Sequence, residues 1–170
     1  MASGVCFSSR AKSLACPDGS TRGWGGCLSF SSRVPSRRLE PRRALFVCTR
    51  NSARSQLAAA IWKQMTQTAA LSAGTHPAEQ VYPGAIAAAK RAGLSLEGAA
   101  PHALDKVATL PRLVVTVCDQ AHEELDANDT WLHWSIQDPV VVGTKAAFDS
   151  TVAELRARII VLVGETGVAL

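Results

Sequence analysis

The chain has 170 residues, enough for one domain with a sizeable core, and 47% of them are apolar. No apolar run approaches the eighteen or so residues that a membrane span needs, so we expect a soluble protein with no membrane partner. The net charge of +4 is uneven: residues 1–43 hold eight Lys or Arg and two acidic residues, whereas residues 44–170 hold ten and twelve. The basic balance therefore belongs to the N-terminal segment, and it gives no support to nucleic-acid binding by the remainder.

The cysteine pattern favours a reducing compartment. Five cysteines are an odd number, and they contain no CxxC pair. This argues against a disulfide-stapled secreted domain and against a structural zinc site. We therefore expect a cytoplasmic protein without a metal. The cysteines are Cys6, Cys16, Cys27, Cys48 and Cys118.

Residues 1–43 are rich in Ser, Gly and Arg and show neither a helical nor a strand period. We expect a disordered basic extension, or a start codon assigned too far upstream. A transit peptide is the alternative, because the segment is poor in acidic residues. A secretory signal is disfavoured, since the N-terminus lacks an apolar core segment. Residues 44–170 are expected to form the folded domain.

From residue 44 onward, short apolar runs alternate with segments of helical spacing. Strands are predicted at 44–48, 71–74, 113–117 and 131–134, and helices at 54–67, 82–92, 120–125 and 148–163. Gly93 follows the second helix, where a C-cap glycine is expected. The alternation predicts a single α/β domain with a four-stranded parallel sheet flanked by helices on both faces. Ligands in such folds bind beyond the carboxyl ends of the strands, where Cys48 and Cys118 are predicted to lie.

The spacing C-x5-R occurs three times, beginning at Cys16, Cys27 and Cys48. Only Cys48 follows an apolar strand and precedes a helix, an arrangement in which backbone N–H groups converge on an anion. We expect that field to lower the pKa of the Cys48 thiol and favour the nucleophilic thiolate. The predicted oxyanion-binding residues are Thr49, Arg50, Asn51, Ser52, Ala53, Arg54 and Ser55.

Several side chains of this loop have predicted roles. The planar fork of Arg54 suits two oxygens of a tetrahedral anion. Ser55 is expected to donate a hydrogen bond to the Cys48 sulfur. Asn51 is expected to hold the loop through bonds to its backbone, and Arg50 either adds positive potential or faces solvent.

Residues 47–58, VCTRNSARSQLA, resemble the active-site loop of the low molecular weight protein tyrosine phosphatase superfamily, and most of all its arsenate reductase branch. Further matching motifs follow in the family's order at 72–75, 114–118 and 133–139, so the resemblance covers roughly residues 44–163. The chain is also similar to the reductase half of proteins that carry an arsenic-sensing helix-turn-helix repressor. Residues 1–43 cannot encode that repressor half.

The resemblance implies that Asp138 is the general acid that protonates the leaving oxygen as Cys48 attacks. The following Pro139 restricts Asp138 to an extended backbone and helps to fix its direction. On local sequence alone, the Asp–Pro pair would be read as an ordinary turn.

Cys118 has two interpretations. It is either a small buried residue that caps an apolar strand, or a resolving thiol that attacks Cys48 once arsenic is bound. Thioredoxin-linked arsenate reductases of the family carry another cysteine several residues later, but residues 119–126 contain none. Either thioredoxin reduces a Cys48–Cys118 disulfide directly, or a small thiol such as mycothiol, with mycoredoxin, takes the arsenic from Cys48. No tightly bound cofactor is expected.

The first hypothesis for function is therefore an arsenate reductase that uses an external thiol. The second is a phosphatase that acts through a phosphocysteine. Cys118 favours the reductase, because phosphatase chemistry needs no redox partner. Val140 also favours it, because it follows the Asp–Pro pair where the phosphatases commonly carry a tyrosine.

A third hypothesis, of another class, is a non-catalytic oxyanion-binding or interaction module. The intact set of reactive and binding side chains argues against it. His122 and His133 have no partner at metal-ligand spacing, so surface or core roles are expected for them.

Overall fold

The computed structural model of the chain describes residues 42–125 and 130–165. The disorder expected for the N-terminal extension therefore concerns residues that, apart from Arg42 and Arg43, lie outside the described part. Among the described helices, none is both long and apolar enough to cross a membrane.

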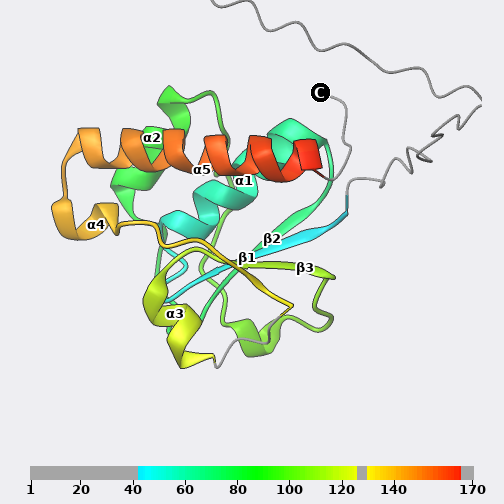
Figure 1. Ribbon diagram of the computed structural model, residues 1–170. Coiled ribbons are helices and arrows are strands. Elements are labelled where there is room, and N and C mark those ends of the chain that lie inside the picture. The colour runs from blue at the N-terminus through cyan, green and yellow to red at the C-terminus, as the bar shows by residue number, and fades with distance from the viewer. Residues whose placement is uncertain (1–41, 126–129, 166–170) are drawn as a thin grey trace, which may run out of the picture. The chain divides into compact units, whose positions relative to one another are not determined.

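The sheet has four parallel strands in the order β2-β1-β3-β4 (Figure 1). The strands are β1 (Ala44–Cys48), β2 (Ala70–Gly74), β3 (Leu113–Thr116) and the short β4 (Leu132–His133). All five residues of β1 are buried, because the strand is paired on both edges and covered on both faces. The predicted four-stranded parallel sheet is confirmed.

Helices cover both faces of this sheet. They are α1 (Arg54–Thr66), α2 (Pro83–Arg91), α3 (Asp119–Glu124), α4 (Pro139–Val142) and α5 (Lys145–Glu165), with a 3-10 turn η1 at Leu104–Lys106. Figure 1 shows α1, α2 and α5 on one side of the sheet and α3 on the other. The predicted placement of helices on both faces is confirmed.

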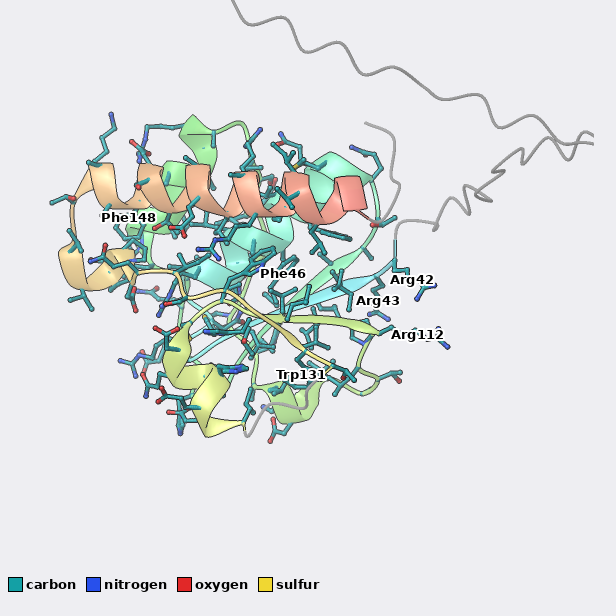
Figure 2. The ribbon with its side chains drawn as sticks, viewed as in Figure 1. Arg42, Arg43, Phe46, Arg112, Trp131 and Phe148 are labelled. Atoms are coloured by element: carbon teal, nitrogen blue, oxygen red, sulfur yellow. The ribbon has the colours of Figure 1, made fainter. Side chains whose placement is uncertain are left out.

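Aromatic rings fill the space between the central strand and its cover. Phe46 of β1 lies in the middle of the domain (Figure 2), and its ring centroid is 6.1 Å from those of Trp62 and Trp134. The apolar face predicted for the last helix, from Phe148 to Ile159, is buried in the same core. Burial of each such side chain contributes about 1.5–3 kcal/mol to the stability of the fold. This apolar layer therefore fixes the position of β1 and of the loop that begins at its end.

The helix α4 was missed by the sequence prediction, which expected no helix at Asp138 and Pro139 and read the pair as a turn that interrupts regular structure. The Asp138 carboxylate accepts a hydrogen bond from the backbone N–H of Val140 at 3.0 Å, and Pro139 occupies the first turn. Gly143 ends the helix with φ +70°. An Asp cap followed by proline begins a helix as readily as it breaks one, because proline at this position sacrifices no helical hydrogen bond.

Gly74, the last residue of β2, is opposite Cys48 in the strand pairing. A Cβ atom at Gly74 would lie 2.7 Å from the carbonyl oxygen of Thr49 and 3.0 Å from the Cβ of Asn51. The backbone N–H of Gly74 also donates to the His102 carbonyl at 2.8 Å. Absence of a side chain is therefore what lets β2 approach the segment after β1.

We predict that Gly74→Ala destabilises the protein by about 1–3 kcal/mol, because the added methyl group must displace the Thr49 carbonyl. Urea unfolding followed by circular dichroism measures this change. Gly164→Ala is the matched control: a Cβ there meets no atom within 4 Å, and the change removes a flexible residue from α5. Equal midpoints for the two variants would contradict the steric argument.

Candidate active site

Residues 49–53 form a loop between β1 and α1, and three of its backbone carbonyls accept hydrogen bonds from outside the loop, from the segment that follows β2. The Thr49 carbonyl accepts from His76 N–H at 2.8 Å, the Arg50 carbonyl from Ala78 N–H at 2.9 Å, and the Ser52 carbonyl from Tyr82 N–H at 2.8 Å. In a trans peptide the N–H points away from the C=O. The N–H groups of these peptides therefore turn toward the inside of the loop, which is the geometry of an anion-binding site.

Asn51 holds the loop in this shape. It is fully buried and has φ +49°, a left-handed conformation that asparagine tolerates better than most residues. Its Nδ2 donates to Ser55 Oγ at 2.8 Å, while its Oδ1 accepts from His102 N–H at 2.8 Å and from Gln56 Nε2 at 3.2 Å. The expected side-chain bonds to the loop's own backbone are thus replaced by bonds to α1 and to residue 102.

The sulfur of Cys48 receives hydrogen bonds from the loop and from α1. Ser55 Oγ lies 3.0 Å from Cys48 Sγ, and Asn51 N–H donates to the same sulfur at 3.2 Å. Because Ser55 Oγ already accepts from the Asn51 side chain, its own proton is available for the sulfur. The predicted contact between Ser55 and Cys48 is confirmed.

The expected direction of the Cys48 pKa is wrong. Burial is the largest influence and raises the pKa of the Cys48 thiol, because a thiolate there loses its hydration. Hydrogen bonds from the side chain and backbone of Ser55 lower this pKa, the nearby Cys118 raises it, and the charge of Arg54 lowers it. The loop sequence shows these donors but not the depth of burial, which is why the prediction failed.

Arg54 lies between the loop and the segment that carries Asp138. Its Nη1 donates to the carbonyl of Ile136 at 2.8 Å, and its Nη2 contacts Asp138 Oδ2 at 2.7 Å. The Arg54 side chain is 11% exposed and that of Asp138 is 30% exposed. A guanidinium carries five N–H donors, so these two contacts leave donors for an oxyanion. The structure thus joins two predicted site residues that are far apart in sequence.

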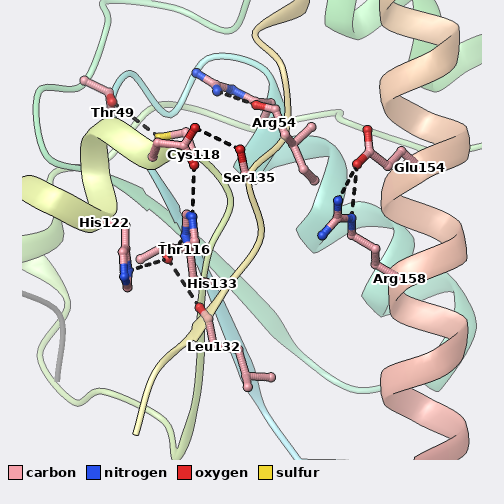
Figure 3. Close-up of polar contacts among 12 residues, drawn as sticks. Thr49, Arg54, Thr116, Cys118, His122, Leu132, His133, Ser135, Glu154 and Arg158 are labelled. Atoms are coloured by element: carbon pink, nitrogen blue, oxygen red, sulfur yellow. Dashed lines mark hydrogen bonds and ion pairs between the residues drawn. The ribbon is translucent and has the colours of Figure 1, made fainter. Parts of the chain in front are cut away.

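Cys118 follows β3 and immediately precedes α3. Its side chain is buried, and its Sγ lies 3.4 Å from Thr49 Oγ1 (Figure 3). Cys48 and Cys118 are both free thiols. The two cysteines therefore lie at the carboxyl edge of the sheet, with Cys118 against the residue next to Cys48.

The other predicted loop residues differ in exposure. Thr49 and Ala53 are buried, Ser52 is half-buried, and Arg50 faces solvent. Ala53 caps α1 without a side-chain hydrogen bond. No side-chain acceptor of Ala53 therefore competes with a bound anion for the first N–H groups of the helix.

Comparison with known proteins agrees with this geometry. The family model for low molecular weight phosphotyrosine protein phosphatases matches residues 43–167. The chain belongs to this family. Comparison with curated protein sequences gives no match.

Solved structures similar to this low molecular weight phosphatase family member include both arsenate reductases and phosphatases. An arsenate reductase from Archaeoglobus fulgidus is 30% identical, with a TM-score of 0.59 over 71% of this chain and 98% of that chain. The tyrosine phosphatase Wzb from Escherichia coli K30, solved with sulphate, is 20% identical, with a TM-score of 0.65 over 74% and 98%. A thioredoxin-dependent arsenate reductase from Corynebacterium glutamicum is 24% identical, with a TM-score of 0.56 over 73% and 61%. The chain is therefore an enzyme of the superfamily that contains both phosphatases and arsenate reductases.

A second polar cluster, beside α3, was not predicted. The rings of His122 and His133 stack with centroids 4.1 Å apart, and each Nδ1 contacts Thr116 Oγ1, at 3.2 and 2.9 Å (Figure 3). His133 Nε2 lies 2.9 Å from Asp119 Oδ1, and Ser135 Oγ donates to Asp119 Oδ2 at 2.8 Å. The Ser135 bond is the main cause that lowers the pKa of Asp119. Sequence spacing gave no signal because the members come from different elements.

We predict that alkylation of Cys48 by iodoacetamide rises with pH, with its midpoint above the usual cysteine range. The sign follows from burial: a raised pKa leaves less thiolate at any given pH. Ser55→Ala should shift the midpoint higher and slow alkylation at pH 8 about tenfold, since a hydrogen bond to a charged group contributes about 1.5 kcal/mol. Mass spectrometry of the Cys48 peptide gives the rate.

Ser52→Ala is the control for this prediction, because it removes a hydroxyl from the same loop without removing a bond to the sulfur. Its midpoint should match that of the unaltered protein. A midpoint below the usual cysteine range, or equal shifts in both variants, would contradict the account of the Cys48 environment.

Proposed function

We propose that the protein is an arsenate reductase in which Cys48 is the nucleophile and Cys118 is the resolving thiol. The observation that carries this proposal is the contact of Cys118 Sγ with Thr49 Oγ1 at 3.4 Å. Cys118 is buried beside the loop, and its charge raises the pKa of Cys48. A second thiol in this place has a role in redox chemistry and none in phosphate ester hydrolysis.

The first step joins Cys48 to arsenic. The inward-facing N–H groups and Arg54 bind the arsenate oxygens, and the sulfur attacks As(V). An As–O bond breaks, and the departing oxygen leaves as water after it receives the thiol proton. Asp138, at the edge of the loop through its contact with Arg54, first accepts that proton from the thiol and then delivers it to the leaving oxygen. The product is an arsenic adduct on Cys48, with arsenic still in the As(V) state.

The second step reduces the arsenic. The Cys118 thiolate attacks the sulfur of Cys48, a disulfide forms, and the sulfur–arsenic bond breaks with its electron pair on arsenic. As(V) becomes As(III), which leaves as arsenite, while two thiols are oxidised to one disulfide. An external dithiol such as thioredoxin then reduces the Cys48–Cys118 disulfide and is itself oxidised.

Two electron donors are consistent with the proposed reaction. The similar enzyme from Corynebacterium glutamicum is described as thioredoxin-dependent, which supports thioredoxin as donor. In the alternative route a small thiol such as mycothiol removes arsenic from Cys48, and mycoredoxin completes the reduction. Cys118 is dispensable in that route, so the two routes differ in one testable residue.

Phosphatase activity is the second candidate, because the same loop suits a phosphoryl group. Phosphate and arsenate share charge and tetrahedral shape, and the similar phosphatase Wzb was solved with sulphate. The residues after Asp138 give this candidate less support. The residues of α4 after Pro139 are valines, and Val141 is 85% exposed. An aromatic substrate would instead be bound by aromatic side chains at these positions.

We predict that Cys118→Ser lowers arsenate-dependent oxidation of thioredoxin by at least about a hundredfold, because the arsenic adduct on Cys48 then has no internal thiol to release it. Hydrolysis of para-nitrophenyl phosphate, which needs only Cys48, should change little in this variant. Cys48→Ser should abolish both reactions. Thioredoxin-coupled NADPH consumption and nitrophenol release measure the two activities.

Full arsenate turnover by Cys118→Ser with mycothiol and mycoredoxin would contradict the internal relay while leaving the reductase standing. Ester hydrolysis without arsenate-dependent consumption of either thiol would establish the phosphatase instead. Absence of both reactions in the unaltered protein would overturn the assignment of catalysis.

A further inference from the structure

A cavity of about 360 Å³ lies beside the edge strand β2, among residues that the proposed reaction does not use. Its lining includes Arg43, Ser72, His102, Lys106 and Thr109. Apolar residues, among them residues 71 and 107, complete the wall. This volume is within the range of small-molecule sites, and a few polar groups on an apolar wall are their usual composition.

The polar lining of this cavity is cationic. Within the part of the chain that the structure describes, neither Arg43 nor Lys106 forms an ion pair. The neighbouring carboxylate of Asp105 lines a different cavity, together with Leu104 and Glu124. Two unpaired cations with nearby hydroxyl and imidazole groups match the chemistry of a phosphoryl group, which needs positive charge and several donors.

Two further arginines strengthen the positive potential at this end of the sheet. Figure 2 shows Arg42, Arg43 and Arg112 close together where β1 and β3 begin. The strand register agrees, because Ala44 pairs with Leu113. Arg42 and Arg112 do not line the cavity, so they add to the field without belonging to the site.

His102 connects this cavity to the oxyanion loop. His102 lines the cavity, while its backbone N–H donates to Asn51 Oδ1 at 2.8 Å and its carbonyl accepts from Gly74 N–H at 2.8 Å. The adjoining carbonyl of Ala100 accepts from Gln56 Nε2 at 3.0 Å. A ligand that fixes residues 102–109 would therefore also fix the side chain of Asn51.

We propose that this cavity binds a small molecule with a phosphoryl group, and that binding there stabilises the oxyanion loop through the backbone of His102. Because such coupling is reciprocal, an anion in the loop also strengthens binding in the cavity. The proposal holds for either activity of the enzyme, since it concerns the shape of the loop and not the fate of its substrate.

Titration of the full-length ¹⁵N-labelled protein with inorganic phosphate, followed by amide NMR shifts, tests both parts. Two binding events are expected: one at residues 48–55, and one at Ser72 and residues 106–109. The double variant Arg43→Gln/Lys106→Gln should lose the second event. Its loop should bind phosphate about fivefold more weakly, a factor at the low end of measured couplings.

The double variant Arg42→Gln/Arg112→Gln is the matched control, because it removes the same charge from the same end of the sheet but no residue from the cavity. It should retain both events and the original loop affinity. All four side chains are exposed, and the amide spectra report directly that each variant is folded.

Absence of shifts at residues 106–109 in the unaltered protein, or their persistence in Arg43→Gln/Lys106→Gln, would overturn the site. Loss of the second event with unchanged loop affinity would overturn the coupling. Equal weakening of the loop in both double variants would also overturn it, because long-range charge would then account for the effect.

Discussion

The buried side chain of Asn51 is the constraint on which the rest of the site depends. It joins the loop to Ser55 on one side and to the backbone of His102 on the other, and Ser55 in turn contacts the Cys48 sulfur. Asn51, Ser55 and Cys48 are buried, so loss of one partner among them leaves another polar group unsatisfied at a cost of about 1–3 kcal/mol. The nucleophile, the anion-binding loop and residues 100–102 are therefore held as one unit.

The raised pKa of the Cys48 thiol fits the binding of a dianion. A neutral thiol leaves the positive charge of Arg54 and the inward N–H groups unopposed, whereas a thiolate in the same place would repel the arriving anion. The thiol proton is then available to leave with the departing oxygen. Burial, which works against a free thiolate, is thus compatible with a substrate that accepts the proton as the bond to sulfur forms.

The sequence predicted the parts of the molecule whose cause is local. Patterns within single segments predict the apolar strand β1, the alanine-rich α1 and the apolar face of α5. The contact of Ser55 with Cys48 was predictable because only a short loop separates the two residues. The parallel direction of the strands followed from their alternation with helices.

Features that depend on distant segments were not predictable in this way. The ion pair between Arg54 and Asp138 joins residues 84 positions apart, and the anchoring of Asn51 requires His102, a residue without a distinctive local motif. The direction of the Cys48 pKa depended on burial by the whole fold. The helix α4 was missed because Asp–Pro has the same local sequence in a turn and at a helix start.

The central claim is that Cys48 and Cys118 act as a pair on arsenic. The most direct test is peptide mass mapping of the fully reduced protein after one arsenate turnover without external thiol. The account predicts a disulfide between Cys48 and Cys118, formed in proportion to the arsenite released. Arsenite release without this disulfide, or an arsenic adduct that persists on Cys48 while Cys118 stays reduced, would contradict it.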